Sequence, residues 1–283
     1  SRIFVERPAS QGAALRARPR PKRILPGVKT LKEVNMSGNL SWRKIVQSTI
    51  HIIRLYMSRR CSIVKQPSLL IEELLTMIKI LGKRSSINVR KVLWTCEEAG
   101  IAYQQEDYGS GFQSIETPAF RALNPNSLVP VLLDGDFVLW ESTSICRYLA
   151  RKAGREDLLP TAPQAAAEVE RWMDWQATEF NTAWRYAFMG LVRKDPRFQE
   201  PTAIKESIVA WTRCVQILNA QLQQTGAWVA GSQFTLADIV LGLSVHRWKM
   251  TPFAHPEMAE VERWYMALNQ RPAFKRHGNN GVA

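Results

Sequence analysis

Cysteine is scarce in this sequence of 283 residues. The four cysteines, Cys61, Cys96, Cys146 and Cys214, are widely spaced, and no two of them form a CxxC pair. This distribution argues against a disulfide framework and against a structural zinc site, and it fits a reducing compartment such as the cytoplasm. We therefore expect each cysteine to be a small buried hydrophobic side chain.

Histidine and uninterrupted apolar sequence are scarce as well. The four histidines, His51, His246, His255 and His277, have no spacing typical of a metal site or a catalytic triad. No apolar run reaches about 18 residues, the length that a membrane-spanning helix needs. We therefore expect no bound metal and no membrane span.

Acidic residues are nearly absent from residues 1–76, which hold 15 Lys+Arg and 4 Asp+Glu. Residues 77–283 hold 23 Lys+Arg and 21 Asp+Glu. The formal charge of +13 for the whole chain would suggest a polyanionic partner, but nearly all of it belongs to the first segment. The remainder of the chain gives no reason to expect nucleic acid as a partner.

Residues 1–76 are predicted to be a basic leader, largely disordered or non-native. They begin with an Arg- and Pro-rich stretch, and residues 40–60 form a possible basic amphipathic helix. Such a helix could lie on a membrane or a nucleic acid, or serve in targeting. We favour upstream sequence translated in frame, or a leader with little function, because charge and composition change at Met77. In addition, Glu72-Glu73 can be encoded by a purine run like a ribosome-binding site.

Residues 77–155 show the element order β-α-β-α-β-β-α. The predicted strands and helices occupy residues 78–81, 89–100, 101–108, 117–123, 129–133, 137–140 and 141–154. Asp134-Gly135 is a hairpin signal, and Thr117-Pro118 has the residue types of a helix start. Pro130 lies at the beginning of a strand, where its missing N–H is costly, so we expect a cis Val129–Pro130 bond.

The sequence from residue 164 to 283 is predicted to be entirely helical, after a linker at 154–163. Its sharpest local signal is Thr235-Leu236-Ala237-Asp238, a variant of the capping box, which precedes an apolar helix. We interpret Asp238 as a structural residue. Its loss should destabilise the fold by about 1 kcal/mol or more.

Two segments carry a resemblance to a known family. They are IKILGKRSSINVRKVLWTCEEAGI and NPNSLVPVLLDGDFVLWESTSICRYLA. In this combination they resemble bacterial cytosolic glutathione S-transferases of the serine type, which are theta-like, and the resemblance covers about residues 77–276. It implies an α/β plus all-α architecture, in which a thioredoxin-like glutathione-binding domain (77–155) precedes an all-helical domain (164–283) with the acceptor-substrate pocket.

The resemblance assigns a glutathione site to four residues. The backbone of Val129, before Pro130, is expected to pair with the cysteinyl backbone of glutathione. Glu141 is expected to meet the amino group of the γ-glutamyl end, and Ser142 with the helix amides its carboxylate. Without the resemblance, a plain N-cap would explain Ser142, and an acid that complements the helix dipole in the first turn would explain Glu141.

The loop at residues 83–88 is expected to stabilise the glutathione thiolate. In the relatives a serine of this loop donates to the sulfur; Ser85 is the first choice, Ser86 the second, and Asn88 a weaker alternative. One of the serines could serve only as a helix cap. For the neighbouring cations Lys83, Arg84 and Arg90, a solvated charge is the favoured interpretation.

Two departures from the family pattern stand out. The relatives usually carry a lysine near the glycine end of glutathione, where this chain has Leu128, so glutathione should bind less tightly unless another basic residue substitutes. In addition, no cysteine lies in the first loop, since Cys96 falls well inside a helix. This argues against the cysteine-type relatives that form mixed disulfides.

The acceptor pocket is expected in the helical half, opposite Ser85. Candidate lining residues are Trp172, Trp175, Trp184 and Tyr186, although ordinary helix packing explains any single one. Arg171, Arg185 and Arg247 are unranked candidates for contact with substrate or a dimer partner.

The resemblance implies a homodimeric detoxification enzyme with glutathione as co-substrate and a small hydrophobic electrophile as acceptor. It would conjugate the electrophile or reduce hydroperoxides. The alternatives are a glutathione-dependent isomerase or dehalogenase, and a non-catalytic binding module of the same fold.

Overall fold

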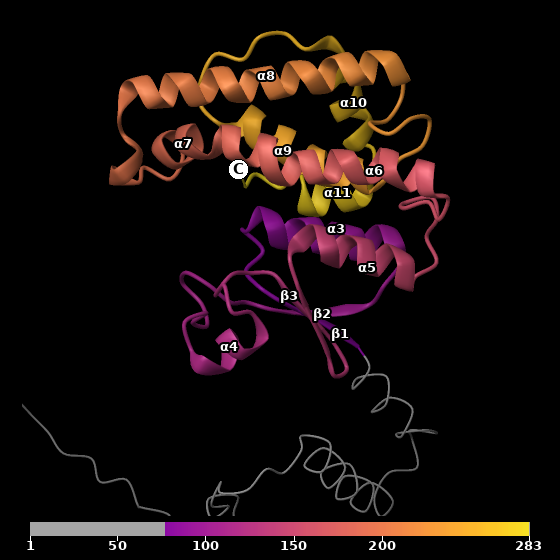
Figure 1. Cartoon of the computed structure of the whole chain (residues 1–283). Coiled ribbons are helices and arrows are strands. Elements are labelled where there is room, and N and C mark those ends of the chain that lie inside the picture. The colour runs from indigo at the N-terminus through magenta and orange to yellow at the C-terminus, as the bar shows by residue number, and fades with distance from the viewer. Residues whose placement is uncertain (1–76, 283) are drawn as a thin grey trace, which may run out of the picture. The chain divides into compact units, whose positions relative to one another are not determined.

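The computed structural model describes residues 77–282 (Figure 1). The first part of this range forms a four-stranded sheet with helices. Its elements are β1 (Ile78–Leu81), α3 (Ile87–Ala99), β2 (Tyr103–Glu106), α4 (Pro118–Leu123), β3 (Val131–Asp134), β4 (Phe137–Trp140) and α5 (Ser142–Lys152). This is the predicted order. Two predicted strands are shorter than expected: β2 begins two residues later, and β3 begins only after Pro130.

The strand order is β2-β1-β3-β4. β1 and β2 run parallel, which the crossover helix α3 requires, and the other neighbouring pairs are antiparallel. The turn between β3 and β4 includes Gly135 at φ 61°, a left-handed conformation that glycine adopts without steric cost. This is the hairpin that Asp134-Gly135 predicts.

α3 covers the sheet with the apolar face expected from its spacing. Val89, Val92, Leu93 and Cys96 are fully buried, and α3 packs against α5. The helix ends at Gly100, whose φ of 70° is left-handed and whose N–H bonds back to the last turn. Thr117 likewise caps α4, since its side chain accepts from the N–H of Phe120 at 3.2 Å.

Helices make up the rest of the described chain. They are α6 (Pro163–Trp175), the π-helix η2 (Gln176–Phe180), α7 (Asn181–Leu191), the 3₁₀ turn η3 (Pro196–Phe198), α8 (Pro201–Thr225), α9 (Leu236–Met250), α10 (Ala259–Leu268) and α11 (Pro272–His277). The long segment α6-η2-α7 is continuous but contains the π turn. Such turns rotate the following helical face and are frequent at functional sites.

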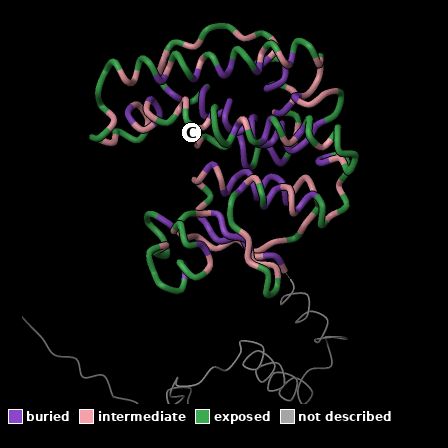
Figure 2. Tube along the Cα trace, viewed as in Figure 1, coloured by how far each residue is buried: buried purple, intermediate pink, exposed green. Residues whose placement is uncertain are grey.

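α9 is the central helix of this half, and it is buried on every side (Figure 2). The carboxylate of Asp238 accepts four hydrogen bonds: from the N–H and hydroxyl of Thr235 (2.9 and 3.2 Å), the N–H of Val229 (3.0 Å) and the indole of Trp264 (2.8 Å). Burial nevertheless raises the pKa of Asp238 to about 6. The capping box is confirmed, and Asp238 is structural as predicted.

The sheet domain and the helices share one apolar core. Trp94 of α3 is fully buried, with its ring 4.9 Å from Phe274 and 6.0 Å from Phe234. Gly242 of α9 allows this approach, because a Cβ there would lie 3.1 Å from the Trp94 ring and 2.9 Å from Leu268. The two halves are therefore packed into a continuous hydrophobic interior.

The α/β plus all-α architecture is confirmed, while the predicted domain limits remain a prediction. The leader, residues 1–76, lies outside the described residues. Within residues 77–282, none of the helices combines the length and apolar character that a bilayer crossing requires.

Candidate active site

The register of the sheet brings three separate segments to one edge. Leu81 of β1 pairs with Val131 of β3, and Val131 pairs with Trp140 of β4. The residues just beyond these three positions are the loop at 82–86, the Val129–Pro130 step and the Glu141–Ser142 step. All the residues predicted to hold glutathione therefore lie at the same end of the sheet.

Gly82 allows the closest of these approaches. Its φ is +146°, and a Cβ at this position would lie 2.9 Å from the Cβ of Val129 and 2.5 Å from Val89. No side chain fits there without displacing the backbone of one loop. The first loop and the Val129–Pro130 step are thus in direct contact because residue 82 is glycine.

The loop at 83–86 leads into the N-terminus of α3. Ser86 is the N-cap residue, but its side chain makes no capping bond. The side chains of Ser85 and Asn88 likewise have no hydrogen-bond partner among the described residues, and all three are partly exposed. Three polar side chains and the positive end of a helix are thereby left available to an anionic ligand.

The Val129–Pro130 peptide bond is cis, as predicted. Pro130 is buried, whereas Val129 is partly exposed. Within residues 77–282 the N–H and C=O of Val129 have no backbone partner. An extended peptide lying along Val129 would satisfy both groups.

Glu141 and Ser142 form the start of α5. Glu141 has φ 72°, an unusual conformation for a residue other than glycine, and its side chain is exposed. Ser142 is buried, at 6% exposure, in the first turn of the helix. The first intrahelical bond here runs from the N–H of Ile145, so the amides of Ser142 and Thr143 lack a helical acceptor.

Leu128 is exposed, at 59%, beside these segments. The basic residue that reaches its loop is Arg121, which donates to the hydroxyl of Ser127 at 3.3 Å. Arg121 also forms a 2.5 Å ion pair with Glu116, so its charge is already balanced. The missing lysine is therefore not simply replaced by a free cation at this loop.

The described cysteines are not nucleophiles. Cys96, Cys146 and Cys214 are buried, and burial is the main cause that raises the pKa of each thiol. For Cys146 and Cys214 the pKa rises to about 11. Burial therefore disfavours the thiolate form of these three cysteines. In residues 77–282, no three His, Cys, Asp or Glu side chains group as metal ligands would.

A buried polar chain near the site was not predicted from sequence. The Lys91 ammonium of α3 is fully enclosed and donates to the Gln176 side chain of η2 at 2.7 Å. Gln176 in turn donates to the hydroxyl of Ser244 on α9 at 3.0 Å. Burial lowers the pKa of Lys91 to about 8. The chain joins the sheet domain to the helices through the π turn, which a search for local patterns cannot detect.

The interpretation of Arg90 as a solvated charge was wrong. Arg90 is 1% exposed, and its guanidinium donates to the carbonyls of Val282 (2.8 Å) and Gly278 (3.3 Å). Arg84, in contrast, is exposed and donates to Gln105. Arg247, unranked in the sequence analysis, is also buried and lies 4.4 Å from the ring of Trp184.

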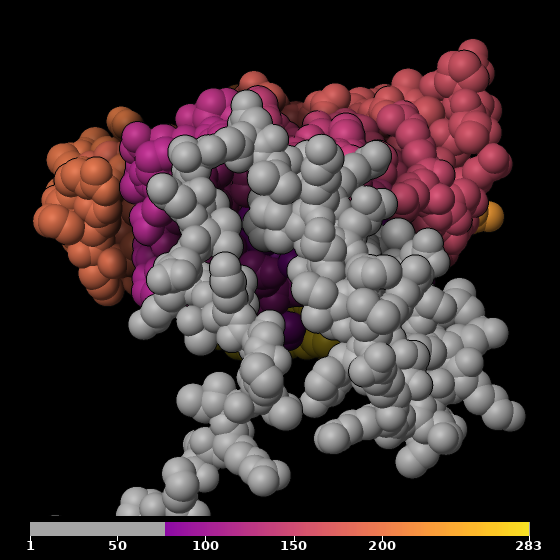
Figure 3. Space-filling view, turned by 90° about the horizontal axis from the view of Figure 1, so that it is seen from below, coloured from indigo at the N-terminus to yellow at the C-terminus, as the bar shows by residue number. Residues whose placement is uncertain are grey.

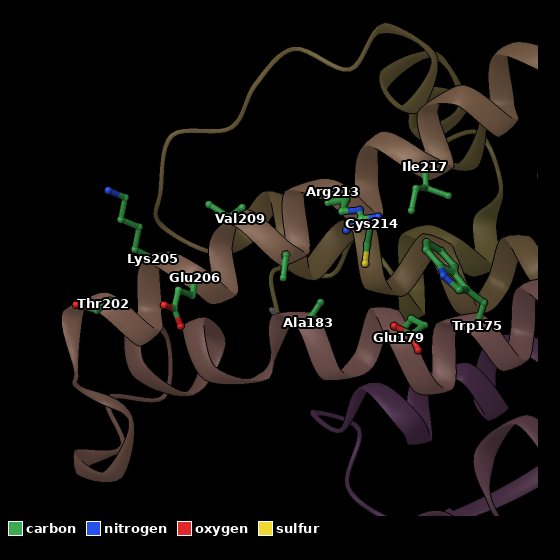
Figure 4. Close-up of a pocket in the computed structure, with 11 residues that line it drawn as sticks. Trp175, Glu179, Ala183, Thr202, Lys205, Glu206, Val209, Arg213, Cys214 and Ile217 are labelled. Carbon is green, nitrogen blue, oxygen red and sulfur yellow. The ribbon is translucent and has the colours of Figure 1, made fainter.

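The predicted acceptor-pocket aromatics separate into different environments. The indoles of Trp172 and Trp175 meet edge to face, Trp184 stacks on Arg247, and Tyr186 packs against Phe198. Trp175 lines a groove of about 740 Å³ between η2-α7 and α8 (Figure 4). None of the predicted glutathione-binding residues lines this groove, although it is spacious.

Comparison with known proteins agrees with this arrangement. Residues 85–152 match the family model of the glutathione S-transferase N-terminal domain, and residues 181–272 that of the C-terminal domain. The chain is 36% identical over 202 residues to Glutathione S-transferase GstB of Escherichia coli, covering 71% of this chain and 97% of that protein. It is 31% identical over 207 residues to Glutathione S-transferase 3 of Zea mays, covering 70% and 92%.

Among solved structures, a theta class glutathione S-transferase from Xanthomonas axonopodis pv. citri with glutathione bound is similar, with a TM-score of 0.68 and 39% identity. The match covers 72% of this chain and 97% of that chain. Both halves of the fold, the arrangement of the loops at the sheet edge and these similarities lead to one conclusion. The chain belongs to the glutathione S-transferase family.

Proposed function

We propose that this chain binds glutathione at the edge of its sheet and transfers the glutathione sulfur to an electrophile. The observation that carries the proposal is the register Leu81–Val131–Trp140. This register places three groups at one end of the sheet. They are the unpaired peptide group of Val129, the N-terminus of α5 with Glu141 beside it, and the N-terminus of α3 with the hydroxyls of Ser85 and Ser86. These groups match the backbone, the γ-glutamyl end and the thiol of one tripeptide.

The backbone and the γ-glutamyl end of glutathione have separate partners in this proposal. The N–H and C=O of Val129 pair with the cysteinyl backbone, in the manner of an added strand. The γ-glutamyl carboxylate accepts from the Ser142 hydroxyl and the free amides of the first turn of α5. Glu141 receives the amino group, and its left-handed backbone keeps its side chain in solvent at the helix start.

The reaction itself needs a thiolate, because the thiolate is the nucleophile. A hydroxyl of Ser85 or Ser86, or the Asn88 amide, donates to the sulfur anion, and the α3 N-terminus adds a favourable field. The sulfur then attacks an electrophilic carbon and the leaving group departs. The contribution of the protein is orientation and charge stabilisation. A hydroperoxide is the second acceptor class in this proposal.

Titration with glutathione and turnover of a neutral aromatic electrophile test the proposal. Ser142→Ala should raise the KM for glutathione about tenfold, because a charge-assisted hydrogen bond is lost. Ser144→Ala, on the exposed side of the same helical turn, is the matched control and should leave the KM unchanged. Absence of glutathione binding, or equal effects of the two variants, would refute the proposed site.

We further infer a homodimer that acts in the cytoplasm in detoxification. Support for the dimer comes from α8, where Val209 and Ile217 are 63% and 42% exposed and line the same groove as Trp175 (Figure 4). Apolar side chains at such positions are typical of a surface that a second copy covers.

A further inference from the structure

Three arginines from three different elements influence one another's charge, and two of them, Arg193 and Arg247, contact the same ring, that of Phe188. Arg90 belongs to α3, Arg193 follows α7, and Arg247 belongs to α9. Burial lowers the pKa of Arg90 to about 10, with the charge of Arg193 as the second cause. Burial also lowers the pKa of Arg247, and the charges of Arg90 and Arg193 add to this effect. The three guanidinium groups therefore repel one another.

No acid of the described chain neutralises this arginine cluster, which we define as Arg90, Arg193 and Arg247. None of the three forms an ion pair with an Asp or Glu among residues 77–282. The buried Nε and Nη2 of Arg90 and the buried Nε of Arg247 have no hydrogen-bond partner among residues 77–282. Buried donors without acceptors are rare and costly, so they indicate a place for an anionic ligand.

Two aromatic rings pack against the arginine cluster. The Arg247 guanidinium lies 4.4 Å from the ring of Trp184 and 4.1 Å from that of Phe188. The exposed Arg193 lies 5.3 Å from the centroid of the same Phe188 ring. A ligand that combines an apolar or planar body with a negative group would contact both the rings and the guanidinium groups.

The arginine cluster lies within reach of the proposed thiolate donors. Arg90 is one helical turn from Ser86, to whose carbonyl its N–H bonds at 3.0 Å. One turn of helix advances about 5.4 Å. A small acceptor substrate that touched the cluster would therefore have its reactive carbon near the thiol of glutathione.

A cationic groove opens beside the cluster on the surface. It has a volume of about 660 Å³, and the side chains of Lys83, Arg193, Lys194 and Arg197 line it with only one acid, Asp195. Asp195 is already paired with Arg197 at 2.7 Å. Figure 3 shows the orange residues after α7 lying against the magenta residues of the sheet domain, where Ser110 forms the opposite wall. A groove with this excess of positive charge attracts anions.

We propose that the acceptor substrate is an electrophile that carries a carboxylate, which Arg193 and Arg247 bind beside the rings of Trp184 and Phe188. This inference rests on the proposed transferase function and names its substrate class. Neutral electrophiles of the same shape react more slowly, because they leave the arginine cluster without a counter-charge.

A matched pair of electrophiles tests the proposal: para-chloro-meta-nitrobenzoate and the corresponding benzamide. In both, the glutathione sulfur attacks the carbon that bears chlorine and forms a C–S bond. The C–Cl bond breaks, chloride leaves with the bonding pair, and the thiol proton passes to solvent. Each kcat/KM is divided by the rate constant of the uncatalysed reaction with glutathione, which removes the intrinsic difference in reactivity.

The normalised kcat/KM should favour the benzoate by about tenfold, the strength of one charge-assisted contact. Arg193→Gln should abolish most of this preference and leave the benzamide rate within about twofold of the wild type. Arg193→Lys should retain part of the preference for the benzoate. Arg185→Gln is the control, because Arg185 is an exposed arginine of α7 outside the cluster. Arg247→Met, if it folds, should act like Arg193→Gln.

A binding measurement separates this inference from the proposed function. Without glutathione, para-nitrobenzoate should quench tryptophan fluorescence at lower concentration than para-nitrobenzamide, and Arg193→Gln should remove the difference. Equal binding, or a benzoate preference that survives in Arg193→Gln and Arg247→Met, would overturn the inference. Failure of both chloronitro compounds to react, with selective nitrobenzoate binding intact, would instead count against the transferase and leave the anion site standing.

Discussion

Ser86 occupies the N-cap position of α3 without using its hydroxyl as a cap. This separates the two roles that the sequence leaves open for a serine in this loop. If the hydroxyl donates to the thiolate, Ser86→Ala should raise the pKa of bound glutathione by roughly 1–2 units, the value of one hydrogen bond to a charge. The free energy of unfolding of the Ser86→Ala variant should differ little from that of the wild type, because no capping bond is lost.

The ultraviolet absorbance of the thiolate, recorded against pH in the binary complex, measures that pKa. Ser85→Ala is the parallel variant, because Ser85 is the other serine of the loop, and Ser86→Thr should preserve the donor. If both alanine variants leave the thiol pKa unchanged, and Asn88→Ala does as well, then the loop side chains do not activate the thiol.

Replacement of Leu128 by lysine should strengthen glutathione binding. Leu128 is exposed where relatives usually carry a lysine, and Arg121 at the same loop is already paired with Glu116. Leu128→Lys should therefore lower the KM for glutathione about two- to fivefold at low salt, the range expected of an exposed ion pair. Steady-state kinetics with varied glutathione measure this. Leu128→Met keeps the size without the charge, and an equal KM in both variants would argue against an electrostatic role.

At the scale of elements, α9 depends on a carboxylate that is buried and yet fully hydrogen-bonded. The folded-state pKa of Asp238, about 6, lies above its ordinary value of 3.8, so the folded state binds more protons between these two pH values. The stabilising contribution of Asp238 is therefore fully present below about pH 4 and falls as the pH rises to 6. Above pH 6 it should be constant.

Urea unfolding of the wild type and Asp238→Asn, at intervals from pH 4 to 7, tests this sign. The asparagine does not titrate, so the difference in free energy of unfolding isolates the carboxylate. We expect that difference to decrease by about 2–3 kcal/mol across the range, the equivalent of two pKa units. A difference that stays level or increases would contradict the prediction.

The elements differ in how well the sequence predicts them. The β3–β4 hairpin, the cap of α4 and the capping box of α9 depend on residues a few positions apart, and the structure confirms all three. The burial of Arg90 and Lys91 depends on residues far along the chain. The segment 278–282 accepts hydrogen bonds from Arg90, and Gln176 of η2 accepts one from Lys91. Charged residues next to apolar ones give no local sign of such distant partners.

The same distinction applies to the site. That the segments 82–86, 129–130 and 141–142 lie together at one end of the sheet could be predicted, because the resemblance places them next to recognisable strands. The arginine cluster could not be predicted, because α3, α7 and α9 meet only through tertiary packing. The π turn η2 likewise interrupts a helix whose apolar spacing continues on both sides, so the sequence pattern indicates one long helix.

At the scale of the molecule, the groove between η2-α7 and α8 bears on assembly. Val209 and Ile217 lie on α8 beside this groove, and neither contributes to the hydrophobic core. If a second copy covers this surface, Val209→Arg should weaken the dimer by placing a charge in an apolar contact. Light scattering coupled to size-exclusion chromatography should then show a monomer at concentrations where the wild type is a dimer.

Lys205→Glu is the control for that experiment, because it also changes a charge on an exposed position of α8 at the rim of the groove. Its mass in solution should stay that of the wild type if apolar contact holds the copies together. Activity with glutathione separates assembly from folding. The segments that we propose to bind glutathione lie at one end of the sheet and none lines the groove, so Val209→Arg should remain able to bind glutathione. A Val209→Arg protein that is still dimeric would place the contact between copies on another face.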